Sequence, residues 1–188
     1  MSLSLEKIKA MKKIKEEFMD IKKNTIENIG VTVGLPNEDN IFEWKITLKG
    51  PRDSSYAGGL FFLRIIFPEN YPTKAPEVCF ITPIYHLNVN PYNNIGIKLG
   101  NVSLNFLNNW KLGYTMKDIF IYIFILLYKP NPDNAYGLER ANEFRFNKQL
   151  YEDKIKYFTK KYANPGFNDI DKKYDNWDFS YDKLLKKI

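Results

Sequence analysis

The sequence contains a single cysteine and a single histidine among its 188 residues. One cysteine excludes a disulfide framework and a cysteine-rich zinc site, and one histidine argues against a histidine-based metal centre. We therefore expect neither a metal nor a cofactor. A chain without disulfides suits a reducing compartment, so the composition favours the cytoplasm, the nucleus or both.

Long hydrophobic stretches are also missing. The longest apolar run covers residues 119–128, between Asp118 and Lys129. A segment that crosses a bilayer needs about 20 such residues, and the N-terminal residues lack the apolar core of a signal peptide. We expect no membrane association.

Charge of one sign is not concentrated anywhere. The chain has 28 Lys and Arg against 22 Asp and Glu, a formal charge of +6. Without a dense basic stripe we expect no nucleic-acid partner. With 44% hydrophobic and 16% aromatic residues, disorder of the whole chain is excluded. The length predicts one core domain, residues 1–163, with a C-terminal extension, residues 164–188.

Residues 4–23 have the pattern of an amphipathic helix, with Ser4 as the N-cap. Apolar residues recur at spacings of three and four, which places them on one face. Lysines occupy much of the opposite face. The apolar set is Leu5, Ile8, Met11, Ile14, Phe18 and Ile21, and the polar set is Lys9, Lys12, Lys13 and Glu16.

Short strands follow this helix. Residues 42–48 alternate between apolar and polar side chains, the pattern of a half-buried strand. Further strands are expected at 60–67 and 77–81, and a weaker one at 29–33. Turn residues separate these segments, so an antiparallel meander is predicted.

The second half of the chain has a different pattern. Residues 86–110 lack periodicity and are rich in Asn and Gly. Thr115 and Asp118 have the spacing of a capping box, and the apolar run after them predicts a helix buried on all sides. Apolar spacing over residues 151–162 predicts a further helix. The order of elements is that of an α+β fold.

Several motifs in a fixed order resemble the ubiquitin-conjugating enzymes, over roughly residues 5–163. The resemblance implies the UBC fold, with an N-terminal helix, a four-stranded antiparallel meander, a central buried helix and C-terminal helices. The motifs are Trp44-Lys-Ile-Thr-Leu-Lys-Gly-Pro51, Tyr56-Ala-Gly-Gly59, Phe67-Pro68, Tyr71-Pro72, Ala75-Pro76, His86-Leu87-Asn88, Gly100-Asn-Val-Ser-Leu104 with Trp110 after it, and Pro130-Asn-Pro-Asp133.

The resemblance also implies an activity. Members of this family receive ubiquitin or a ubiquitin-like protein from an activating enzyme and hold it as a thioester on one cysteine. They pass it to a substrate lysine, usually with a ligase. Ser103 stands in the position of that cysteine. A serine hydroxyl is a weak nucleophile unless an adjacent base activates it, and the family's counterpart of His86 is structural.

The resemblance gives Asn88 one of two roles: it supports the oxyanion of the transfer step, or it orders the active-site loop. Other positions depart from the family. Leu87 replaces a proline, and residues 89–99 lengthen the segment before Ser103. Asn134 stands where many members have an aspartate that helps to deprotonate the incoming lysine, and an amide cannot supply that negative charge.

Partner surfaces are implied as well. Lys9, Lys12 and Lys13 match the face that meets the activating enzyme, although a solvated helix face is the simpler explanation of them. Thr73 and Leu112 follow the Tyr-Pro and Trp motifs, where the family has an aromatic residue and a Ser-Pro-Ala sequence that bind ligases. We therefore expect altered ligase binding. Cys79 lies in a strand pattern and is expected to be a buried, inert thiol.

Three hypotheses stay open. The first is a conjugating enzyme whose nucleophile position holds serine, so that Ser103→Cys restores thioester formation. The second is a catalytically inactive variant that binds ubiquitin or pairs with a second, active conjugating enzyme. The third is a globular scaffold with no link to ubiquitin.

Overall fold

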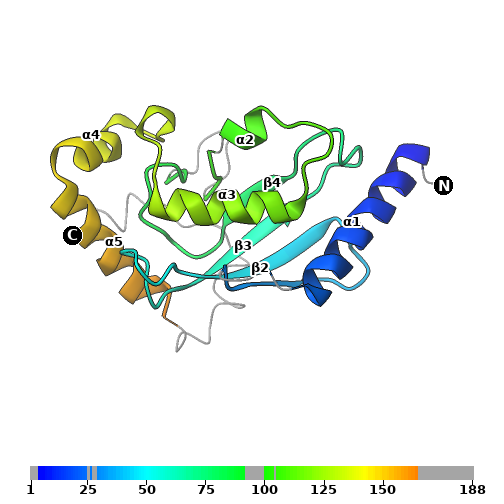
Figure 1. The fold of residues 1–188 in the computed structure, drawn as a ribbon, viewed down its shortest axis with the longest axis horizontal. Coiled ribbons are helices and arrows are strands. Elements are labelled where there is room, and N and C mark those ends of the chain that lie inside the picture. Colours follow the sequence, from blue (N-terminus) through cyan, green and yellow to red (C-terminus); the bar gives the residue numbers. More distant parts are fainter. Residues whose placement is uncertain (1–3, 25, 27–28, 92–99, 104, 165–188) are drawn as a thin grey trace.

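The computed structural model describes residues 4–24, 26, 29–91, 100–103 and 105–164. One antiparallel sheet forms its centre, with the strands in the order β1-β2-β3-β4. Helix α1 (Leu5–Lys23) lies at one end of the molecule and helices α4 (Leu138–Phe146) and α5 (Lys148–Tyr162) at the other, while α3 (Met116–Tyr128) crosses between them (Figure 1). This is the predicted α+β order.

The sheet follows the period-2 patterns closely. Its strands are β1 (Val31–Gly34), β2 (Glu43–Lys49), β3 (Leu60–Ile66) and β4 (Glu77–Phe80). Each boundary lies within two residues of the prediction. Side chains alternate between buried and half-buried along β2 and β3, because successive residues of a strand point to opposite faces. The thiol of Cys79 on β4 is buried, as expected.

Helix α1 begins as predicted, since the Ser4 hydroxyl accepts a hydrogen bond from the Lys7 backbone N–H at 3.2 Å. Its apolar face is buried only from Ala10 onward. Leu5 and Ile8 are exposed because the first turns extend past the sheet (Figure 1). Among the buried residues of α1 is Glu17, a charged side chain that the apolar spacing did not predict.

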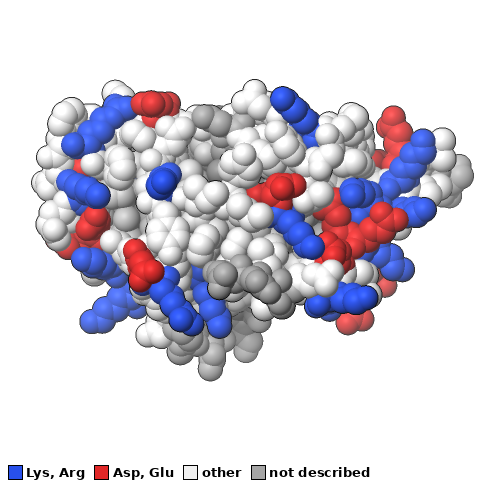
Figure 2. All heavy atoms as spheres, in the orientation of Figure 1, with Lys and Arg blue, Asp and Glu red and all other residues white. Residues whose placement is uncertain are grey.

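Helix α3 begins with the predicted capping box, in which Thr115 and Asp118 each bond the other's backbone N–H. Burial on all sides is wrong, however. One face packs on the sheet and the opposite face is exposed, where Figure 2 shows a largely uncharged surface between charged groups at the two ends of the molecule. A two-layer domain covers only one side of its helix, whatever the composition of the other side. The exposed apolar residues are Ile121, Tyr122, Ile125 and Tyr128.

The apolar spacing over residues 151–162 is confirmed, because Tyr151, Ile155, Phe158 and Tyr162 are all buried in α5. The short helices α2 (Asn105–Asn108) and η1 (Pro132–Asn134) were not predicted, since neither is long enough to show a period. The expectations for residues 92–99 and 165–188 lie outside the described residues. No helix in the part of the chain that the structure describes is long and apolar enough to cross a membrane.

Candidate functional site

Ser103 and Asn88 lie side by side. The backbone N–H of Ser103 donates to the carbonyl of Asn88 at 2.8 Å, next to a bridge that pairs Val89 with Val102. Gly100 allows the chain to enter this pairing: its φ is +76°, and a Cβ there would lie 2.1 Å from the Phe80 carbonyl oxygen. The half-buried Ser103 is therefore placed beside the loop that contains Asn88.

The side-chain amide of Asn88 forms hydrogen bonds with backbone groups at both its nitrogen and its oxygen. Its amide nitrogen donates to the carbonyls of Asn131 and Asn134 at 2.7 and 2.8 Å, and its oxygen accepts from the Asn131 N–H at 2.8 Å. Asn88 is completely buried. Both amide hydrogens are engaged, so Asn88 has no donor left for an oxyanion. This geometry favours the loop-ordering role over the oxyanion role.

His86 is completely buried, and both of its ring nitrogens are occupied. Nδ1 accepts from the Asn88 backbone N–H at 2.9 Å, which leaves the proton on Nε2, 3.0 Å from the Leu126 carbonyl oxygen. Burial lowers the pKa of His86 from 6.5 to about 4, because a buried ring resists charging. The ring is thus a neutral structural element and has no free nitrogen to take a proton from Ser103.

The hydroxyl of Tyr151 satisfies the backbone N–H of Leu87. A proline at this position would carry no N–H, whereas the N–H of the buried Leu87 donates to the Tyr151 hydroxyl at 3.1 Å. The Leu87 carbonyl accepts from the Tyr136 N–H at 2.7 Å. Both backbone groups of Leu87 are satisfied, so the departure from His-Pro-Asn leaves no unpaired polar group there.

Side chains of the C-terminal helices α4 and α5 contact the same loop, which contains Tyr85 and His86. Arg140 on α4 donates to the His86 carbonyl at 3.1 Å. The Tyr85 hydroxyl donates to Glu143 at 2.6 Å, and Lys154 on α5 pairs with the same carboxylate. Burial, followed by this hydrogen bond to Glu143, raises the pKa of Tyr85. Sequence reasoning missed these supports, because isolated polar residues on helices give no signal of where their partners lie.

Comparison with known families agrees with this arrangement. A model of the family described as ubiquitin-conjugating enzyme matches residues 13–159. The chain belongs to the ubiquitin-conjugating enzyme family. The match extends from α1 into α5, so it includes the sheet, the loop of Asn88 and the segment of Ser103.

The segment that contains Asn134 also contacts the Asn88 loop. The Asn134 carbonyl accepts from Asn88, so the segment after α3 lies directly against the Asn88 loop. The Asn134 Nδ2 atom is buried and makes no hydrogen bond within the described residues. Residue 134 therefore contributes a neutral, buried amide to this segment.

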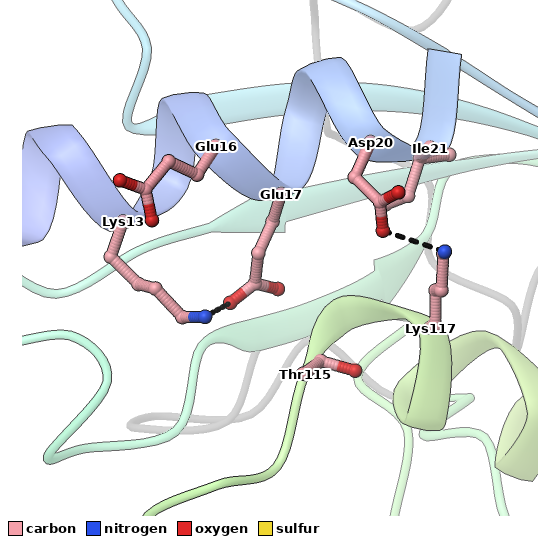
Figure 3. A pocket seen from close by; sticks show the side chains of 7 residues that line it. All are labelled: Lys13, Glu16, Glu17, Asp20, Ile21, Thr115 and Lys117. Carbon is pink, nitrogen blue, oxygen red and sulfur yellow. Dashed lines mark ion pairs between the residues drawn. The ribbon is translucent and has the colours of Figure 1, made fainter. Parts of the chain in front are cut away.

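The lysines predicted to meet the activating enzyme differ in their surroundings. Lys9 and Lys12 are exposed, whereas Lys13 forms an ion pair with Glu17 on the same helix at 3.4 Å. Figure 3 shows Lys13 and Glu17 beside a pocket of about 180 Å³ between α1 and the start of α3. Lys9 and Lys12 are therefore the more available members of the predicted set.

Glu17 holds α1 onto α3. Its carboxylate accepts from the Tyr71 hydroxyl at 2.9 Å and from the Met116 backbone N–H at 2.7 Å. A second link joins Lys117 to Asp20 at 2.6 Å (Figure 3). Burial raises the pKa of Tyr71, with the Glu17 charge adding to that effect. Most charges around this pocket thus connect the two helices.

The two loops predicted to bind a ligase are brought together. The Trp110 indole N–H donates to the Pro72 carbonyl at 2.7 Å, which fixes the loop of Thr73 against the loop of Leu112. Thr73 is exposed, and Leu112 is 74% exposed. Among the described residues no group of three or more His, Cys, Asp or Glu side chains could hold a metal ion.

Proposed function

We propose that this protein acts in ubiquitin or ubiquitin-like conjugation as a member that binds the modifier without carrying it as a thioester. The observation that supports this most is the environment of Ser103. The only histidine, His86, is buried with both nitrogens engaged. A serine hydroxyl without a base is a poor nucleophile, whereas a cysteine thiol has a reference pKa near 8.5 and forms a strongly nucleophilic thiolate.

The exposed face of α3 supports non-covalent binding of the modifier. Ile121, Tyr122, Ile125 and Tyr128 form an apolar surface, and the Tyr122 ring stacks on Phe106 with centroids 4.2 Å apart. Phe106 follows Ser103 by three residues. Exposed apolar surfaces of this kind commonly mark sites for a protein partner. We propose that the modifier docks on this α3 face.

Other partners follow from the same assignment. We propose that Lys9 and Lys12 contact an activating enzyme, and that the loops of Thr73 and Leu112 contact a ligase or a second, active conjugating enzyme. Thr73 stands where the family has an aromatic residue, and Leu112 offers an exposed apolar side chain in the neighbouring loop. We further propose a core domain over residues 1–163, an extension over 164–188, and a cytoplasmic or nuclear location.

A second candidate function is conjugation by a Ser103→Cys form. One observation favours it: the scaffold around the nucleophile position is intact. Helices α4 and α5 hold the loop of His86, Leu87 and Asn88 through Arg140 and Tyr151. A thiol placed at residue 103 would therefore lie beside an ordered loop.

A charging experiment separates the two candidates. The chain and its Ser103→Cys form are each incubated with activating enzyme, ATP and ubiquitin, and ubiquitin binding is measured separately by titration. Binding without any adduct in either form supports the first candidate. A reductant-sensitive adduct in Ser103→Cys alone supports the second. Absence of both binding and adduct would exclude ubiquitin as the modifier and require the test with other ubiquitin-like proteins.

A further inference from the structure

A second pocket, of about 270 Å³, lies between the turn that follows β2 and helix α5. None of its lining residues belongs to the site around Ser103. The Leu60 N–H donates to the Ala163 carbonyl at 2.8 Å, which ties the start of β3 to the end of α5 beside the pocket. Its lining residues are Ser55, Ala57, Gly58, Lys156, Thr159, Lys160, Ala163 and Asn164.

The lining is positively charged. Among the described residues that line it, Lys156 and Lys160 carry the ionisable side chains, and they lie one helical turn apart on α5. Within the described part of the chain neither lysine makes an ion pair. Neighbouring Lys161 differs, because its ammonium donates to the Tyr157 hydroxyl at 2.9 Å. Two like charges at this spacing repel each other, so an anion between them would be stabilising.

Thr159 adds an unused polar group. It lies between the two lysines in sequence, is only 7% exposed and lines the pocket. Its hydroxyl has no hydrogen-bond partner among the described residues. The Thr159 methyl group faces Gly59, since a Cβ built on Gly59 would lie 2.7 Å from Thr159 Cγ2. A buried hydroxyl without a partner costs about 1–3 kcal/mol. An anion in the pocket would supply that partner once a small movement of the Thr159 side chain opened the hydroxyl to it.

The turn side of the pocket is open and polar. Gly58 has a φ of +78°, and no atom lies within 4 Å of the position of a Cβ on it. Ser55 lines the pocket on the same side. Two ammonium groups and two hydroxyls supply the charge and the donors that a compact dianion requires. We propose that this pocket binds a phosphate group, either as inorganic phosphate or as a small phosphomonoester.

The size of the pocket fits this ligand class. Pockets for drug-sized ligands span about 300–1,000 Å³, and this pocket is slightly smaller. A single phosphate with a short substituent is therefore favoured over an extended chain. The proposal is independent of the function proposed above, since it uses no residue of the Ser103 site.

Titration of the full chain tests the proposal. Inorganic phosphate is added at constant ionic strength, and binding is followed by calorimetry and by the amide NMR signals of Gly58 and Thr159. We expect saturable binding. Thr159→Val and the double variant Lys156→Ala/Lys160→Ala should each weaken it by about tenfold or more, a change of about 1.4 kcal/mol. Lys161→Ala is the matched control, because it removes a charge of the same helix outside the pocket.

Thr159→Val separates binding from folding. It replaces the unpaired hydroxyl with a methyl group, so thermal stability should be unchanged or raised while phosphate binding falls. Glycerol phosphate as a second probe distinguishes the source: tighter binding than inorganic phosphate indicates a phosphomonoester, and weaker binding indicates free phosphate.

Two outcomes would overturn the proposal. Equal, non-saturating titrations for the wild type and all three variants would mean an adventitious ion only. Acetate that binds as tightly as phosphate would make the pocket a carboxylate site.

Discussion

The hydroxyl of Tyr151 on α5 accepts a hydrogen bond from the backbone N–H of Leu87, 64 positions away in the sequence, at 3.1 Å. Both residues are buried. Tyr151→Phe removes the acceptor and leaves the N–H unpaired, so we expect a loss of about 1–3 kcal/mol in the free energy of unfolding. Urea denaturation measures this loss.

A double-mutant cycle attributes the effect to this contact. In a Leu87→Pro background there is no N–H to satisfy, so Tyr151→Phe should cost about 1 kcal/mol less than in the wild type. Tyr157→Phe on the same helix is the control, since the Tyr157 hydroxyl accepts a hydrogen bond from the exposed Lys161. Equal costs of Tyr151→Phe in both backgrounds would show that the contact is not what matters.

Glu17 should be a second determinant of stability. Glu17→Leu removes both carboxylate acceptors and leaves the Met116 N–H without a partner. We expect it to lower the free energy of unfolding by about 1–3 kcal/mol, because a buried donor is then unpaired. Glu16→Leu makes the same change on the exposed side of α1 and should stay within about 0.5 kcal/mol. Similar losses for both variants would contradict the role of Glu17.

Much of the fold was predictable, because strands and amphipathic helices repeat at fixed periods. The alternation over residues 42–48 and the spacing over 151–162 each placed an element correctly. The exposed face of α3 was not predictable, since an apolar sequence does not show which side of a helix is covered. Glu17 was missed for the opposite reason: its partners, Tyr71 and Met116, lie far from it in the sequence.

The candidate site was partly predictable. The motifs predicted that Ser103 and Asn88 lie close together. In the structure the backbone nitrogen of Ser103 lies 2.8 Å from the carbonyl oxygen of Asn88. The choice between two roles for Asn88 depended on whether its amide was free. Only the three-dimensional positions of Asn131 and Asn134 answer that question, since both lie more than 40 residues away. Composition carries no information about such pairings.

The α3 face gives a prediction about binding. Ile125→Lys places a charge in the middle of the exposed apolar surface, so it should weaken non-covalent ubiquitin binding by about tenfold or more if this residue anchors the contact. Stability should change little, because Ile125 is exposed. Leu138→Lys on α4 is the matched control, an exposed apolar residue of another helix. Calorimetric titration measures both, and equal affinities would remove α3 from the proposed interface.

The lowered pKa of His86 should make the free energy of unfolding depend on pH in the acid range. The pKa of His86 is about 4 in the folded chain and 6.5 as the unperturbed value, so the unfolded state takes up the proton first. The stability that neutral His86 supplies is complete above pH 6.5 and is lost as the pH falls toward 4, a change on the order of 3 kcal/mol. His86→Gln cannot titrate, whereas the carboxylates remain the same. Urea denaturation between pH 7.5 and 4.5 should therefore give a shallower fall in stability for His86→Gln than for the wild type, even where the variant is less stable at neutral pH. Parallel curves would mean that His86 is protonated equally in both states.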